Sequence, residues 1–132
     1  MTLRQAIYTT LSAGTDLAAL VSARIYPDCA PPGTVQPYCV FSLISAAPEH
    51  YQGGDSGLQH DRVQIDCYAQ TTASADAVAA AVKTAMAATV EADTGIVHAS
   101  QDNALDLAEQ MDDASGQPAY RAMLDYRVWY RG

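Results

Sequence analysis

The residues that most often bind metals are few in this chain and far apart. His50, His60 and His98 show neither the H-x-H spacing nor the i, i+4 spacing that directs two imidazoles to one metal ion. We therefore predict no metal site and no cofactor.

Thiol chemistry is not predicted either. Cys29, Cys39 and Cys67 are odd in number and contain no C-x-x-C pair, so reduced thiols in a cytoplasmic setting are expected rather than a disulfide framework. Cys39 and Cys67 fall inside apolar strand patterns, where a thiol behaves as a small hydrophobe. Cys29 follows Asp28, whose negative charge disfavours a nucleophilic thiolate.

Other catalytic patterns are weak. The chain has no G-x-S-x-G motif, and the glycine-rich segment Gly53–Gly57 lacks the lysine and the following helix of a phosphate-binding loop. The acidic pairs Asp102 with Asp106 and Asp112 with Asp113 lie in polar segments that we expect to be solvated rather than in a catalytic cleft. The sequence predicts no catalytic residue and favours a protein that is not an enzyme.

The composition is that of one soluble globular domain covering residues 1–132, with 49% hydrophobic and 17% charged residues. The net charge of −8 argues against a protein that mainly grips nucleic acid, because such binding depends on Lys and Arg neutralising phosphates. No signal peptide and no membrane-spanning apolar run is evident, so no membrane partner is expected.

The elements that must position any site begin with a helix. Leu3, Ile7 and Leu11 lie four residues apart on one stripe, and Gly14 is expected to end the helix in the left-handed conformation. Asp16 is expected to cap a short further helical turn. A second helix is predicted over 73–89, capped by Thr72 or Ser74, with Val78, Val82 and Met86 as its apolar stripe.

Strands are predicted at 24–26, 38–44 and 60–69, with a long loop at 47–58 between the last two. The 60–69 stretch alternates, so one face is expected to join the core and the other to point away from it. The expected core residues are Val63, Ile65, Cys67 and Ala69, and the expected outer residues are Arg62, Gln64, Asp66 and Tyr68. Further strands are predicted at 96–98, at an edge, and at about 105–111. The order of elements predicts an α+β fold: a mostly antiparallel four- to five-stranded sheet with two helices packed on one face.

A closing strand over 120–131 is the clearest pattern, because its residues alternate strictly over the whole stretch. Tyrosines and aliphatic residues fall on one face, which we expect to join the core. The other face carries Arg and the only tryptophan, residue types that are enriched at protein interfaces. The rival interpretation is that Trp129 only covers a helix. The predicted subunit or tail contacts on this strand are Arg121, Arg127, Trp129 and Arg131.

The 47–58 loop supplies a second group of candidates, because long loops are often functional and flexible segments can order on assembly. A tolerated insertion without function is the alternative. The candidate contacts in this loop are His50, Tyr51, Gln52, Gly53, Gly54 and Asp55.

Three stretches in succession carry a family resemblance: 24–26 leading through a proline-rich loop to 37–41, then 63–69 followed by an alanine-rich helix, and finally 120–130. The chain resembles the tail-completion, or tail-terminator, proteins of long-tailed bacteriophages and related gene-transfer particles. Each motif alone is an ordinary strand, but their order and spacing cover nearly the whole chain.

The resemblance implies a non-enzymatic virion protein that is made in the bacterial cytoplasm and placed at the head-proximal end of the tail. It implies a ring, as a hexamer built from monomers, that caps the finished tube, ends its growth and joins the tail to the head. The implied partners are the chain itself, the major tail tube protein and the head-side connector, with DNA only passing through the lumen. A head-side adaptor, or a small ligand-binding or hydrolytic α+β enzyme using His98 or Cys29, are the alternatives.

Overall fold

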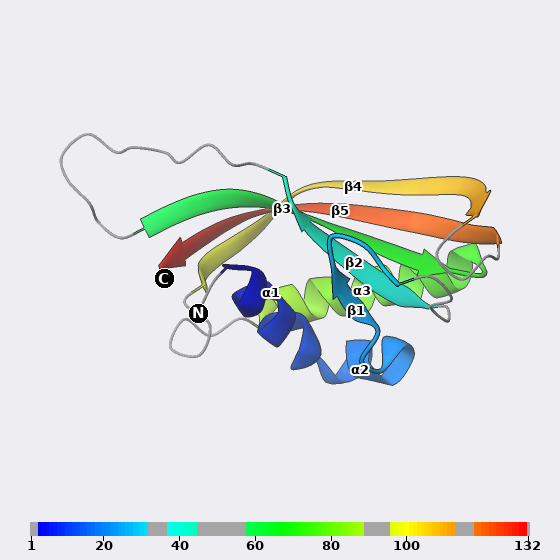
Figure 1. The fold of residues 1–132 in the computed structure, drawn as a ribbon, viewed down its shortest axis with the longest axis horizontal. Helices are drawn as coiled ribbons and strands as arrows, with labels where there is room; N and C mark the ends of the chain where they lie inside the picture. The colour runs from blue at the N-terminus through cyan, green and yellow to red at the C-terminus, as the bar shows by residue number, and fades with distance from the viewer. Residues whose placement is uncertain (1–2, 32–36, 45–57, 89–95, 113–117, 132) are drawn as a thin grey trace.

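The computed structural model describes residues 3–31, 37–44, 58–88, 96–112 and 118–131. Figure 1 labels the elements in chain order. They are α1 (Leu3–Ser12), α2 (Thr15–Val21), β1 (Ile25–Pro27), β2 (Tyr38–Leu43), β3 (Leu58–Ala69), α3 (Thr72–Ala87), β4 (Ile96–Asp112) and β5 (Pro118–Arg131).

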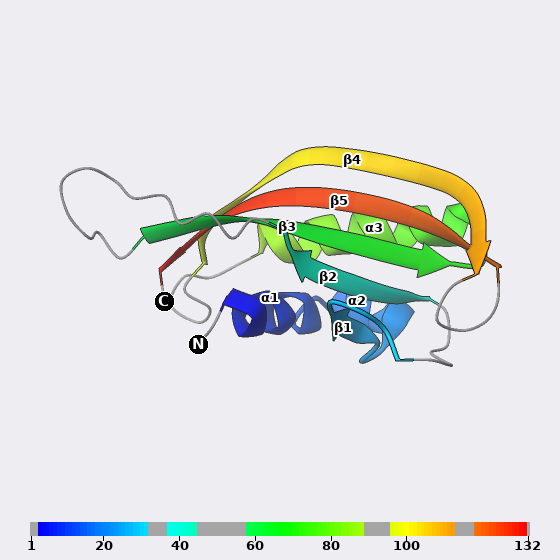
Figure 2. The ribbon, with the colours of Figure 1, turned by 45° about the horizontal axis from the view of Figure 1, so that its top comes forward.

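The described strands form one five-stranded sheet in the order β1-β2-β3-β5-β4. Only β1 and β2 pair in parallel, and every other neighbouring pair is antiparallel. The three helices of the described residues lie on one face of the sheet, and no described helix covers the other face (Figures 1 and 2). The predicted α+β architecture is therefore confirmed, with three helices instead of two.

The additional helix is α2, which begins after Gly14. Gly14 has φ −71° and ψ 112°, so the expected left-handed conformation is wrong. Its carbonyl accepts the Ala18 N–H at 2.9 Å, and Gly14 itself, rather than Asp16, is the N-cap. A Cβ on Gly14 would lie 2.8 Å from Ala85 Cβ. The glycine is needed because the α1–α2 corner packs closely on α3.

Helix α3 is capped by Thr71, one residue before the predicted candidates. The Ser74 N–H donates to Thr71 Oγ1 at 3.1 Å, which satisfies one of the free amides of the first turn. Val78, Val82 and Met86 form the buried stripe, as predicted. Alanines beside this stripe let the helix approach the sheet closely.

The core lies between the helices and the inner face of β2, β3 and β5. Alternation predicted its members on β3 and β5, and the burial of these residues confirms the prediction. Cys39 and Cys67 are opposite each other in the β2–β3 register and are fully buried. The buried inward residues of β3 and β5 are Val63, Ile65, Cys67, Ala69, Ala122, Leu124, Tyr126, Val128 and Tyr130.

Strand β4 is one continuous strand of 17 residues where the sequence predicted two separate pieces. Its pairing with β5 shifts register at three places, between Ile96 and His98, Gln101 and Asn103, and Leu107 and Met111. The first two shifts each place one extra β4 residue against β5, which interrupts the alternation, so no single period of two runs along the strand. Its place at the edge of the sheet agrees with the prediction for 96–98.

Most of the predicted 47–58 loop lies outside the described residues, which resume at Leu58. In the described part of the chain, no helix has both the length and the apolar character needed to cross a membrane.

Candidate assembly interface

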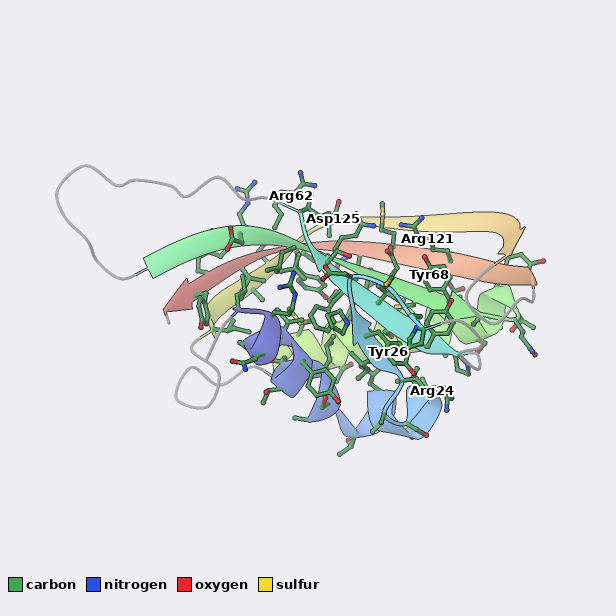
Figure 3. All side chains as sticks on the ribbon, viewed as in Figure 1. Arg24, Tyr26, Arg62, Tyr68, Arg121 and Asp125 are labelled. Atoms are coloured by element: carbon green, nitrogen blue, oxygen red, sulfur yellow. The ribbon has the colours of Figure 1, made fainter. Side chains whose placement is uncertain are left out.

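The helix-free face of the sheet gathers charged and aromatic side chains of β1, β2, β3 and β5. Arg62, Tyr68, Arg121 and Asp125 are among them and are labelled in Figure 3. Because paired residues of neighbouring strands point to the same side, the register fixes which residues meet there. Tyr68 is opposite both Tyr38 on β2 and Arg121 on β5. Tyr26 on β1 is placed opposite Val40, on the same side.

The most buried charge on this face is Asp66, at 6% exposure. Arg121 donates from Nε and from one terminal nitrogen to Asp66 Oδ1, at 3.1 and 3.0 Å. Gln64 Nε2 also lies 3.1 Å from each carboxylate oxygen of Asp66. A buried carboxylate is stable only when its oxygens are paired and hydrogen-bonded in this way.

Three tyrosines extend the same cluster across the sheet. The rings of Tyr38 and Tyr68 stack with centroids 5.0 Å apart, and Tyr26 meets Tyr38 edge-on at 6.4 Å. The Arg121 guanidinium carbon lies 6.0 Å from the centre of the Tyr68 ring, within the range of a cation–π contact. We call this set, Tyr26, Tyr38, Tyr68, Arg121 and Asp66, the Tyr–Arg row.

A second ion pair lies further along the same two strands. Arg62 donates to Asp125 Oδ2 at 3.2 Å, and the Asp125 side chain is 10% exposed. The other oxygen, Asp125 Oδ1, is buried and has no hydrogen-bond partner. An unsatisfied buried acceptor of this kind costs free energy in the folded chain.

Two groups on the core side have raised pKa values. Burial, with a smaller contribution from Cys67, raises the pKa of Tyr126 to about 12. The pKa of Cys67 is raised by its hydrogen bond with Cys39, whose Sγ lies 3.9 Å away, and then by burial. Both groups stay protonated at neutral pH, so Cys67 behaves as the small hydrophobe that the sequence predicted.

The predicted contact residues of β5 have different environments in the structure. Arg121 is held by Asp66 and Tyr68, with a side chain that is only 21% exposed. Arg127 is exposed and Trp129 is half-buried. Arg131 lies in β5, but its side chain is outside the described residues. The predicted loop contacts His50 to Asp55 also lie outside them.

The sequence did not predict which of these side chains contact one another. Alternation placed Arg62, Asp66 and Tyr68 on the outer side of the sheet, but it gave no partner for any of them. Asp66 and Arg121 are 55 residues apart, and only the β3–β5 register brings them together. The sequence did contain one indication of this pair: Asp66 and Arg121 both fall on the outward-facing positions of their alternating strands.

In the portions of the chain that the structure describes, no group of three or more His, Cys, Asp or Glu residues could hold a metal ion. The side chain of His98, the histidine of the enzyme alternative, lies outside those portions, as do His50 and the side chain of His60.

Comparisons with known proteins agree with a role in a virion. Residues 5–131 match the family described as "Tail completion protein gp17". A search of curated proteins finds no match. Among solved structures, a chain in the "Virion of native gene transfer agent (GTA) particle" is similar, with a TM-score of 0.70 and 27% identity over 98% of this chain and 95% of that one.

Family membership also confirms that the protein is not an enzyme, and it sets aside the hydrolytic alternative. The match takes in the closing strand and nearly all of the α+β fold. The chain therefore belongs to the gp17 family of tail completion proteins, which are structural components of the virion tail.

Proposed function

We propose that this protein assembles as a ring, a hexamer, on the finished tail tube, ends growth of the tube and joins the tail to the head-side connector. The observation that carries the proposal is the composition of the helix-free face, where exposed Arg127 and half-buried Trp129 lie on the same face as the Tyr–Arg row. Arginine and aromatic residues are enriched at interfaces and dominate their binding energy.

The internal contacts of this face favour binding. Arg62 and Arg121 are already held by carboxylates in the single chain, at 3.2 and 3.0 Å. Side chains that are fixed before association lose less conformational entropy when a partner arrives.

The net charge of −8 supports a second part of the proposal, that DNA passes through the lumen without being held. Like charge prevents the tight phosphate contacts that would slow DNA movement. Neutralising acids that line the assembled ring should slow DNA release, and unchanged release would remove this part of the proposal.

Negative-stain microscopy of tail tubes with and without the purified protein tests the location and the ring together. We expect a ring at one end of each tube, and particles lacking the protein should carry tails of uncontrolled length. Tails of normal length that fail to attach to full heads would instead identify a head-side adaptor.

The contact face is tested by the double substitution Arg127→Ala with Trp129→Ala. We expect a folded protein that no longer caps tubes. The matched control is Lys83→Ala with Leu20→Ala, which removes an exposed cation and an exposed apolar side chain from the helical layer. A folded β5 variant that caps as well as the control would overturn the role of Arg127 and Trp129. The loop residues His50 to Asp55 remain candidates on sequence grounds.

A further inference from the structure

Two thiols face each other in the core, where β2 pairs with β3. Cys39 and Cys67 are register partners, both are fully buried, and their Sγ atoms lie 3.9 Å apart. Neither thiol belongs to the candidate assembly interface. Two adjacent thiols can be oxidised to a disulfide, a bond that a single buried cysteine cannot form within its own chain.

The backbone hydrogen bonds of β2 show which kind of strand pair the two cysteines form. The Cys39 N–H donates to the Arg24 carbonyl, on the β1 side, at 3.0 Å. The Ile44 N–H, directly after β2, donates instead to the Arg62 carbonyl of β3 at 3.0 Å. Backbone groups alternate in direction along a strand, so the odd-numbered residues of β2 direct theirs towards β1. Cys39 and Cys67 are therefore a non-hydrogen-bonded pair.

The backbone spacing of such a pair suits a disulfide. The Cα atoms of a non-hydrogen-bonded antiparallel pair are about 4.5 Å apart, closer than those of a hydrogen-bonded pair. Disulfides usually bridge Cα atoms that are about 4.4–6.8 Å apart. The two sulfurs therefore need rotation of their side chains, rather than movement of a strand, to approach bonding distance.

The position of β2 in the sheet gives an oxidant a route to this pair. Only β1, a strand of three residues, separates β2 from one edge of the described sheet. Local opening at an edge costs less free energy than global unfolding. A small neutral oxidant such as hydrogen peroxide therefore has slow access to the sulfurs, whereas thiols in a cytoplasm are kept reduced.

We propose that Cys39 and Cys67 are oxidised to a cross-strand disulfide after the virion has left the host cell, and that this bond fastens β2 to β3 in the released particle. Peroxide oxidises one thiol to a sulfenic acid as its O–O bond breaks, and one water leaves. The second sulfur then displaces a second water, so two thiols and one peroxide give one disulfide and two waters. The inference rests on membership of the tail completion family and goes beyond the proposed ring.

Peptide mapping of released particles tests for the bond. Particles from the medium and protein from lysed cells are denatured in the presence of N-ethylmaleimide, which traps the free thiols. Both samples carry Cys29→Ser, so that each relevant tryptic peptide holds one cysteine. Trypsin places Cys39 in the peptide 25–62 and Cys67 in the peptide 63–83. We expect these peptides to be linked in released particles and alkylated in the protein from cells.

The other outcomes would overturn the inference. Alkylated thiols in both samples would show that the bond does not form. Sulfinic acid at either cysteine without a link would show that oxidation does not join the strands. A link already present inside the cell would contradict formation after release. None of these results affects the ring, which microscopy tests separately.

Purified Cys29→Ser protein gives an independent measurement of what the bond does. We expect peroxide treatment to raise its urea midpoint by about 1–2 M, because the bond restricts the unfolded chain between cysteines 28 residues apart. The matched control adds Cys67→Ala, which removes the bond, so peroxide should leave its midpoint unchanged. If that variant does not fold, reduction of the oxidised sample with a phosphine replaces it and should restore the lower midpoint. An unchanged or lowered midpoint in linked protein would contradict the fastening of β2 to β3.

Discussion

Arg121 and Asp66 join β5 to β3 across the helix-free face, with two nitrogens of the arginine donating to one carboxylate oxygen at 3.1 and 3.0 Å. The same guanidinium also lies over the Tyr68 ring. An arginine at this position therefore holds the surface of the sheet in a defined arrangement. Lysine could not replace it, because a single ammonium lacks the planar fork that makes both contacts.

We expect Arg121→Ala to lower the free energy of unfolding by about 2–3 kcal/mol, because it leaves the buried Asp66 carboxylate with only Gln64 as a partner. Arg127→Ala, on an exposed residue of the same strand, should cost less than about 1 kcal/mol. Urea titration of both variants measures the two losses. The double variant with Asp66→Ala should lose less than the sum of the single losses. Strict additivity would show that the pair is not coupled.

Gly14→Ala tests the close approach of the α1–α2 corner to α3. At φ −71° an alanine is conformationally allowed and would ordinarily stabilise the fold. The new Cβ would lie 2.8 Å from Ala85 Cβ, so we expect destabilisation of about 1–3 kcal/mol instead. Thermal unfolding shows whether the Gly14→Ala protein is less or more stable than wild type. Adding Ala85→Gly should recover part of the loss, and a stabilised Gly14→Ala protein would disprove the clash.

Alkylation should distinguish the three thiols. Cys29 is exposed and should react with iodoacetamide in the native protein, whereas Cys39 and Cys67 are buried. The raised pKa of Cys67 further lowers its thiolate population. We expect the two buried thiols to react at least about a thousandfold more slowly, because reaction requires the sheet to open. Mass spectrometry after brief labelling should find one modified cysteine, and three after denaturation. Rapid native labelling of Cys67 would contradict the buried pair.

The raised pKa of Tyr126 makes stability depend on pH in the alkaline range. Below pH 10 its hydroxyl is protonated in both the folded and the unfolded chain, so its full contribution is present. Between pH 10 and about 12 the unfolded chain releases the proton and the folded chain retains it. Stability attributable to this group should therefore fall by about 1.4 kcal/mol per pH unit.

The measured quantity is the difference in the free energy of unfolding between wild type and Tyr126→Phe, from urea titrations at pH 8 to about 12. The difference should be constant below pH 10 and should shift in favour of the phenylalanine variant above it. Parallel curves over the whole range would show that the hydroxyl keeps its ordinary pKa.

Local pattern predicted the α+β class, the buried stripe of α3 and both faces of β3 and β5, because each depends only on periodicity within one element. It failed for Gly14, whose role depends on Ala85 in another helix, and for β4, whose register shifts break the alternation. Within the candidate interface, it identified Arg127 and Trp129 as residue types but could not find the partner of Arg121. The sequence did not reveal the contact of Arg121 with Asp66, because the two residues are far apart in the chain and the register between β3 and β5 is set by the whole sheet.

The order of the strands also determines when the protein can finish folding. Strand β5 follows the other described elements in sequence, yet it lies inside the described sheet between β3 and β4. During synthesis β3 and β4 therefore have no shared neighbour until β5 has left the ribosome, and closure of the sheet must bring together residues far apart in sequence. Until β5 pairs with β3 and β4, the edges that it will occupy are open to other chains, so the nascent protein is prone to aggregate at this stage of synthesis.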